Sequence, residues 1–308
     1  MTALVTDLLR RTALPSCARR ANGFIIVAAL WILAALATLA SIYAVYVINT
    51  ATGMSVNEEK LQAEGLITAA LELTAYRLTS IDADSRPSRG NFVFHLGRAD
   101  VAVEFKSEIG RIDLNMAPKE LLAGLFAGLG AKYQDAEYYA DRIIGWRTPA
   151  DPDGRNAEAS VYRTAGLSYG PRQAPFEHAA ELSLVMGLPP FLVERAMPFV
   201  TVFSGRAEVN VLAAAPEVLA AIPGMSPDRL HALLMALGPA AQNGQPVRGP
   251  GANLFGFTGD AGNAMRIALR IDFDNRHQMF AEAVILLREG AGEPFRVLSW
   301  RDDFDGPS

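Results

Sequence analysis

The chain has little of what most catalytic and disulfide-bonded proteins depend on. Its 308 residues include a single cysteine, Cys17, and only four histidines, which stand far apart. One cysteine cannot form an internal disulfide, and scattered histidines lack the spacing of metal ligands. The sequence also contains no nucleophile-elbow serine, zinc-protease motif, phosphate-binding loop or dinucleotide fingerprint. We therefore predict that the protein is not an enzyme.

Positive charge is also scarce. The chain has 28 lysines and arginines against 33 aspartates and glutamates, a formal net charge of -5. Binding to the phosphates of nucleic acids depends on clustered basic side chains, so this composition predicts a poor generic polyanion binder. Hydrophobic residues make up 50% of the chain, a high share for a soluble protein, and this predicts that part of it lies in lipid.

The hydrophobic residues include one long uncharged run, Phe24 to Ile48, which is 25 residues long. As a helix it would measure about 37 Å, enough to cross a bilayer. Four arginines precede it, and the positive-inside rule then places the N-terminus in the cytoplasm and the bulk of the chain outside. A plain signal anchor explains the run, and a secretory signal cut near "ALATLA" (35–40) is a less favoured alternative, because the apolar sequence continues beyond that site.

The rest of the chain predicts an α+β fold. Residues 49 to about 80 continue the helix into water, with apolar side chains on one broad side. Residues 92–108 alternate like a hairpin, residues 117–241 have a helical texture, and three strands follow from about residue 263. We therefore expect a long N-terminal transmembrane helix packed on an antiparallel sheet, with a large all-α domain inserted between strands.

Two stretches of the helical block resemble each other. "GRIDLNMAPKELLAGLFAGLG" (110–130) matches "GRAEVNVLAAAPEVLAAIPGM" (205–225), with Asn115 aligned to Asn210 and Ala-Pro opening a helix in each. Similar helix caps alone would produce such an echo.

The second stretch runs on to "SPDRLHALL" and resembles a helix-hairpin-helix, which gives an alternative function: a membrane-tethered DNA-binding or uptake protein. Basic residues are few here and Ser226 replaces the second turn glycine, so we expect no nucleic-acid binding.

One loop is rich in carboxylates. In "WRTPADPDGRNAEASVYR" (146–163), Asp151, Asp153 and Glu158 stand close together beside a proline and a glycine. Hard oxygen ligands on a flexible loop are what Ca²⁺ requires. The stretch is not an EF-hand, because the sixth position is Asn156 and the twelfth is Tyr162. A solvated acidic turn is the alternative reading of this spacing.

The order of these segments along nearly the whole chain resembles the K-type minor pseudopilins of type II secretion (the GspK family). The resemblance rests on the Gly23–Phe24 junction before the apolar run, and on "GRIDLNMAPKELLAGL", Trp146 with its acidic loop, "APFEHAAELSLVMGL", "EVNVLAAAPEVLAAIPGM" and the C-terminal strands. It implies that a prepilin peptidase cuts after Gly23 and methylates Phe24. It also implies a pilin-like fold, and calcium held by Asp151, Asp153 and Glu158. The aspartate usual just after the tryptophan is missing, since "RTPA" follows Trp146.

The resemblance also gives the segments and partners that we expect. Most pilins carry glutamate at the fifth mature position, where this chain has Ala28, as suits a subunit that caps the tip and has no neighbour above it. The expected partners are the I-type and J-type minor pseudopilins, the pseudopilus filament and the prepilin peptidase. The protein would be a single-pass protein of the bacterial inner membrane with its bulk in the periplasm, and it would initiate pseudopilus assembly.

The expected segments are a leader at 1–23, a transmembrane helix at 24–48, a pilin-like helix and first strands at 49–115, an inserted helical domain at 116–250 with two SAM-like or helix-hairpin-helix-like halves (about 116–204 and 205–250), and C-terminal strands at 251–308.

Overall fold

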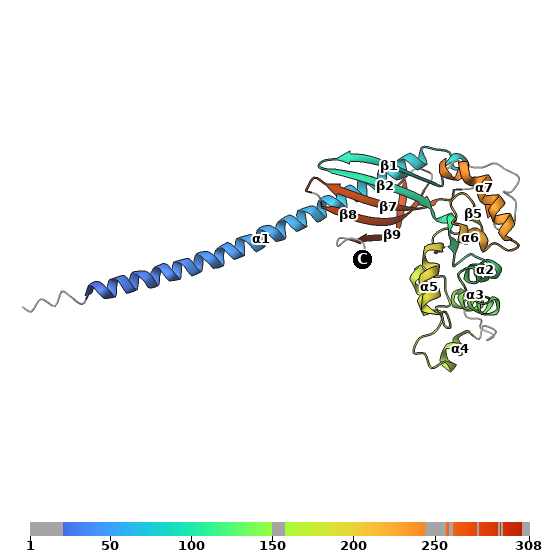
Figure 1. Ribbon diagram of the computed structural model, residues 1–308, viewed down its shortest axis with the longest axis horizontal. Helices are drawn as coiled ribbons and strands as arrows, with labels where there is room; N and C mark the ends of the chain where they lie inside the picture. The colour runs from blue at the N-terminus through green and yellow to red at the C-terminus, as the bar shows by residue number, and fades with distance from the viewer. Residues whose placement is uncertain are drawn as a thin grey trace, which may run out of the picture. The chain divides into compact units, whose positions relative to one another are not determined.

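The computed structural model describes residues 21–149, 158–243, 257–258, 261–275, 277–288, 290 and 292–303. It divides into two units, Met1–Gln62 and Ala63–Ser308, and each is described separately below. The first helix, α1, runs from Ala21 to Thr79, so that it begins in the first unit and ends in the second (Figure 1).

The described part of the first unit, residues 21–62, is helical and mostly apolar. Phe24–Ile48 has a mean hydropathy of 2.5 and is long and apolar enough to cross a membrane. Its threonine and serine hydroxyl groups donate to carbonyls of the preceding turn: the Oγ1 of Thr38 to the Ala34 carbonyl at 2.6 Å, and the Oγ of Ser41 to the Ala37 carbonyl at 2.9 Å. The helix therefore leaves these polar side chains hydrogen-bonded without water, as a lipid environment requires.

The second unit begins with the last turns of α1, which are buried on one side. The buried apolar side chains recur at helical spacing, as expected for a helix that packs on a sheet: Ala63, Leu66, Ile67, Ala70, Leu71, Ala75 and Leu78. They form one core with the inward-facing side chains of a five-stranded sheet.

The sheet is antiparallel throughout, in the order β1-β2-β7-β8-β9. Alternation explains its two faces: in β7, Met265, Ile267 and Leu269 are buried, whereas Arg266 and Arg270 point to the opposite face. The strands are β1 (Arg89–Leu96), β2 (Ala99–Ser107), β7 (Ala264–Phe273), β8 (Gln278–Leu287) and β9 (Phe295–Asp303).

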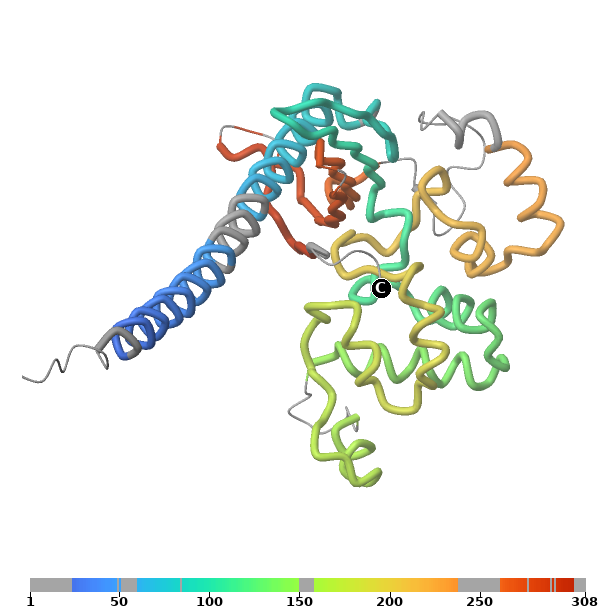
Figure 2. Tube along the Cα trace, turned by 60° about the vertical axis from the view of Figure 1, so that its left-hand side comes forward, coloured from blue at the N-terminus to red at the C-terminus, as the bar shows by residue number. Residues whose placement is uncertain are grey.

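A helical insert leaves the sheet after β2 and returns at β7, and these two strands are hydrogen-bonded neighbours. The insert lies off one end of the sheet (Figure 1, Figure 2). Its α-helices are α2 (Lys119–Gly128), α3 (Tyr133–Arg147), α4 (Glu158–Thr164), α5 (Pro190–Ala196), α6 (Pro216–Ala220) and α7 (Pro227–Asn243). The 3₁₀ segments are η1 (Ala83–Ser85) before β1, then η2 (Glu108–Gly110), η3 (Ala179–Leu184) and η4 (Met197–Phe199). Two short parallel pairs complete it, β3 (Ile112–Asp113) with β4 (Val200–Thr201), and β5 (Val209–Asn210) with β6 (Phe257–Thr258).

The echo in the sequence corresponds to two strand–turn–helix units, but in a different register. Asp113 ends β3 and its Oδ1 accepts a hydrogen bond from the Asn115 amide at 2.8 Å; Asn210 ends β5 and its Oδ1 accepts from the Leu212 amide at the same distance. Asp113 is therefore the equivalent of Asn210. The alignment of Asn115 with Asn210 was wrong by two positions, because the Asx turn at the end of each strand sets the register.

The predicted fold is confirmed: an α+β architecture with a long N-terminal helix, an antiparallel sheet and a helical domain inserted between strands. One local difference lies in "PFEHAAELSLVMGL", whose pattern predicts an ordinary capped helix. The segment forms only the 3₁₀ turns of η3, with Glu181 Oε1 accepting from the amides of Glu177 and His178 at 2.9 and 3.2 Å. Gly187, at φ +84°, ends any continuation three residues later.

Candidate functional site

The expected processing junction lies within the first turn of α1. The helix already begins at Ala21, so Gly23 and Phe24 have helical backbone. The Phe24 side chain is 76% exposed. Most other side chains of the span are exposed as well, and none of them is buried in the structure. If the chain were cut after Gly23, the Phe24 ring and the new amino terminus would both be accessible to an enzyme or a neighbouring helix.

Ala28 lies in the same uncharged span, one turn after Phe24. Between Phe24 and Ile48 the sequence contains no aspartate, glutamate, lysine, arginine or histidine, so that no side chain of this span carries a charge at neutral pH. A glutamate at position 28 would need a partner there, since an unpaired charge at membrane depth costs about 2.5 kcal/mol or more. Alanine removes that requirement.

The acidic loop after Trp146 is only partly described. Asp151 and Asp153 lie outside the described residues. Glu158 opens α4 and its side chain is 4% exposed. Its Oε2 forms an ion pair with the Nη1 of Arg142 on α3, at a distance of 2.8 Å.

Glu158 fits against α3 because residue 145 is a glycine. A methyl group at Gly145 would lie 2.6 Å from the Glu158 Oε2 and 2.7 Å from its carboxyl carbon, far closer than ordinary contact. Burial raises the pKa of the Glu158 carboxyl, while Arg142 opposes this by lowering it. The carboxylate thus lies in a tight, poorly hydrated notch, where it is paired with Arg142.

These contacts bear on whether calcium fits the site. A carboxylate oxygen is the right kind of ligand, but the Glu158 carboxylate is already paired with a guanidinium, which competes with any cation. Within the described ranges, no group of three or more histidine, cysteine, aspartate or glutamate side chains is arranged to hold a metal ion. A complete site therefore needs Asp151 and Asp153 in addition to Glu158.

An aromatic cluster holds both ends of this loop in place. Trp146, in the last turn of α3, stacks on Phe176 with ring centroids 6.0 Å apart, and its Nε1 donates to Glu181 Oε2 at 3.3 Å. Tyr162 on α4 is fully buried, lies 6.1 Å from Trp146, and its hydroxyl accepts from the Met186 amide at 2.8 Å. The loop is therefore anchored at α3 and α4, a role for Trp146 that the motif alone does not reveal.

The helix-hairpin-helix resemblance corresponds to α6 and α7. Gly224, at φ +77°, turns the chain between the two helices. The basic side chain nearest the turn, Arg229, donates its Nη1 to the Gly224 carbonyl at 3.0 Å. This arginine closes the turn itself, and the acidic Glu217 and Asp228 stand in the first turns of the two helices. In the described part of this region, the turn is compact and its nearest arginine is already engaged with the backbone, so the geometry does not favour binding to a phosphate backbone.

Comparison with known proteins gives a match to a protein family and a match to solved structures. Residues 107–205 match the family model described as "Type II secretion system (T2SS), protein K". The fold matches one chain of the crystal structure of the GspK–GspI–GspJ complex from the enterotoxigenic Escherichia coli type 2 secretion system, with a TM-score of 0.58 and 18% sequence identity. That alignment covers 83% of this chain and 99% of the other. No curated protein matches the chain.

The matched region of the family model begins at the end of β2 and ends just before β5, so it contains the acidic loop and its aromatic anchors. The structural match extends over most of the chain, well beyond the residues that match the family model. The comparisons agree with the resemblance inferred from the sequence: residues 107–205 are similar to the type II secretion protein K family, and the chain has the fold of a subunit of the GspK–GspI–GspJ complex.

Proposed function

We propose that the protein is a minor pseudopilin that caps the tip of the type II secretion pseudopilus and initiates its assembly. The observation that carries the proposal is the combination of an uncharged membrane span with a helical insert between β2 and β7. A subunit inside a filament must accept neighbours both above and below it. Ala28 removes the charged group that would pair with a neighbour above, and the insert adds bulk that a repeating stack has no room for.

The partners follow from the same comparison. The matched crystal structure is a complex of GspK with GspI and GspJ. We propose that this chain likewise assembles with I-type and J-type minor pseudopilins, and that small residues such as Ala29, Ala37 and Ala40 let the helices approach closely in lipid. A single N-terminal apolar helix is compatible with a single-pass inner-membrane protein, with the sheet and insert on the periplasmic side.

The first test is the N-terminal residue and mass of the protein isolated from its native membrane. We expect a chain that begins at methylated Phe24, and a Gly23→Ala variant that keeps its leader and fails to restore secretion in a deletion strain. An Ala21→Gly variant is the matched control, since it alters the same helical turn outside the junction. A wild-type chain that still begins at Met1 in secreting cells would contradict the pseudopilin assignment.

The tip position has its own test. Antibodies against the insert should label sheared pseudopili at one end only, and co-purification from detergent should recover the I-type and J-type subunits in fixed proportion. Labelling along the whole length would show that the insert does not restrict the protein to the tip. Salt-sensitive binding of duplex DNA by the purified chain would instead favour the membrane-tethered DNA-binding alternative.

We also propose that the loop after Trp146 binds Ca²⁺ through Asp151, Asp153 and Glu158. The support is the resemblance, together with the buried Glu158 carboxylate at one end of the loop. Because Arg142 competes for that carboxylate, Arg142→Gln should increase calcium affinity, whereas Glu158→Gln and Asp153→Asn should decrease it. The measurement is the rise of the unfolding midpoint with calcium concentration. If Arg142→Gln leaves the calcium dependence unchanged, Glu158 is not a ligand.

A further inference from the structure

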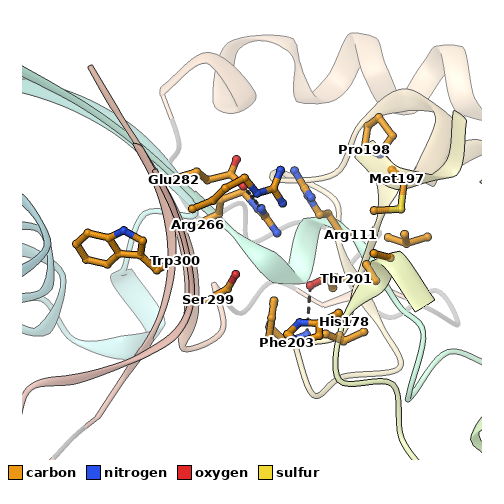
Figure 3. A pocket seen from close by; sticks show the side chains of 15 residues that line it. Arg111, His178, Met197, Pro198, Thr201, Phe203, Arg266, Glu282, Ser299 and Trp300 are labelled. Carbon is orange, nitrogen blue, oxygen red and sulfur yellow. Dashed lines mark hydrogen bonds and ion pairs between the residues drawn. The ribbon is translucent and has the colours of Figure 1, made fainter. Parts of the chain in front are cut away.

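A cleft of about 520 Å³ lies within the second unit, between the charged face of the sheet and the insert (Figure 3). One wall comes from β7, β8 and β9, and the other from η3, η4, β4 and the segment after η2. Its polar lining is unusually rich in cations, with one acidic side chain among them: Arg111, His178, Thr201, Arg266, Glu282 and Arg301.

The acidic groups around the cleft are already engaged. Arg266 donates its Nε to Glu108 Oε1 at 2.7 Å and its Nη1 to Glu282 Oε1 at 2.5 Å. The Thr201 hydroxyl donates to the other oxygen of Glu108, whose side chain is 1% exposed. Two carboxylates and one guanidinium thus form a closed network that joins the sheet to the insert.

Arg111 stands beside this network and is left out of it. Across the part of the chain that the structure describes, its guanidinium has no hydrogen-bond or ion-pair partner. In Figure 3, Arg111 and Arg266 extend toward each other from opposite walls of the cleft. Burial, and then the charge of Arg266, lower the pKa of Arg111, and the charges of Glu108 and Glu282 oppose this only in part. A cation withdrawn from water beside another cation is unfavourable unless an anion compensates it.

We propose that this cleft binds a carboxylate from an acidic segment of a partner protein, with Arg111 as the principal donor. The planar guanidinium offers two parallel N–H groups that match a carboxylate in a bidentate arrangement. Arg301, exposed at the rim, supplies a second cation, and Met197 and Phe203 give apolar surface for the methylene groups of a glutamate.

The lining favours an isolated carboxylate over a nucleic acid. A phosphate backbone needs several unpaired cations in a row, whereas here Arg266 is engaged with two carboxylates and Glu282 remains at the wall. The net charge of -5 would also repel a polyanion. The inference uses only this cleft, so it stands independently of the proposed tip position.

The test is a titration of the full-length chain in detergent with a fluorescent, acetylated and amidated triglutamate peptide, and with the matching triglutamine peptide. We expect the glutamate peptide to bind and the glutamine peptide not to bind. Arg111→Gln should weaken binding by about tenfold or more, the loss of a charge-assisted bidentate pair. Arg163→Gln, an exposed arginine on α4 away from the cleft, should leave the affinity within about twofold.

Stability distinguishes a binding residue from a structural one. Because the Arg111 guanidinium has no hydrogen-bond or ion-pair partner among the described residues, Arg111→Gln should leave the urea unfolding midpoint unchanged or raise it. A lower midpoint would give Arg111 a structural role and overturn the proposal. Equal binding of both peptides, equal affinity of the Arg111 and Arg163 variants, or no binding at millimolar glutamate peptide would also overturn it. So would displacement of the peptide by inorganic phosphate at lower concentration than by glutarate, since this would assign the cleft to phosphate.

Discussion

Gly124 on α2 provides a sharp test of how the insert is packed. A methyl group built there would lie 2.1 Å from the Ala221 carbonyl oxygen at the end of α6, and 2.9 Å from the carbonyl carbon. Carbon and oxygen atoms of protein interiors rest at about 3.5 Å or more, so an alanine would push the two helices apart by about 1 Å. The neighbour is backbone, which no rotamer change can move away.

The magnitude follows from two opposing effects. Replacing a helical glycine with alanine stabilises the helix by about 1 kcal/mol. Overpacking of this kind costs about 1–3 kcal/mol, and a rigid backbone contact belongs at the upper end of that range. We therefore expect Gly124→Ala to lower the free energy of unfolding by about 1–2 kcal/mol. The melting temperature should fall by about 2–4 °C for each kcal/mol.

Gly128 on the same helix is the matched control. It is exposed, and a methyl group there would meet nothing within 4 Å. Gly128→Ala should therefore be neutral or stabilising by up to about 1 kcal/mol. The assay is thermal and urea unfolding of the full-length variants in detergent, followed by circular dichroism. If the two variants unfold alike, or if Gly124→Ala is the more stable, the close approach of α2 to α6 is refuted.

Two further predictions concern buried polar groups. Glu108→Gln should lower the free energy of unfolding by about 2–4 kcal/mol, because it leaves Arg266 with one carboxylate partner fewer in a buried site. The measurement is a urea titration, and a loss below about 0.5 kcal/mol would contradict this prediction. Burial raises the pKa of Tyr162 to about 12, above its ordinary value of 10, so its contribution to stability is fully present below pH 10 and is lost as pH rises toward 12. Unfolding free energies measured across that interval should fall, and Tyr162→Phe should fall less steeply; parallel slopes would show that Tyr162 does not titrate in this way.

The parts of the fold that were predictable rest on local periodicity. The alternation of Arg266 and Arg270 with buried neighbours defined a one-sided strand, and the uncharged run from Phe24 defined the span. Residue identity aligns Asn115 with Asn210, whereas Asp113 and Asn210 make the same turn with different residue types. Aspartate and asparagine side chains both form an Asx turn, so an alignment that requires identical residues misses the equivalence of these two positions.

The sites were less predictable, since they depend on contacts between distant segments. Glu108 lies far along the chain from Arg266, and the pair forms only because η2 follows β2, which is the register neighbour of β7. The spacing of acidic residues likewise pointed to Glu158 as a metal ligand but gave no sign that Arg142 faces it across the notch at Gly145. No local pattern encodes such pairings.

The place where the insert joins the sheet has a consequence for modularity. Ser107 and Met265 are register partners on adjacent strands, so the two ends of the insert leave and re-enter at neighbouring positions. Seen from the sheet, the whole helical domain occupies the position of a hairpin turn. A domain attached in this way can be exchanged, enlarged or lost while the strand order, the hydrogen bonds and the core under α1 stay as they are. The sheet and the helical insert can thus vary separately.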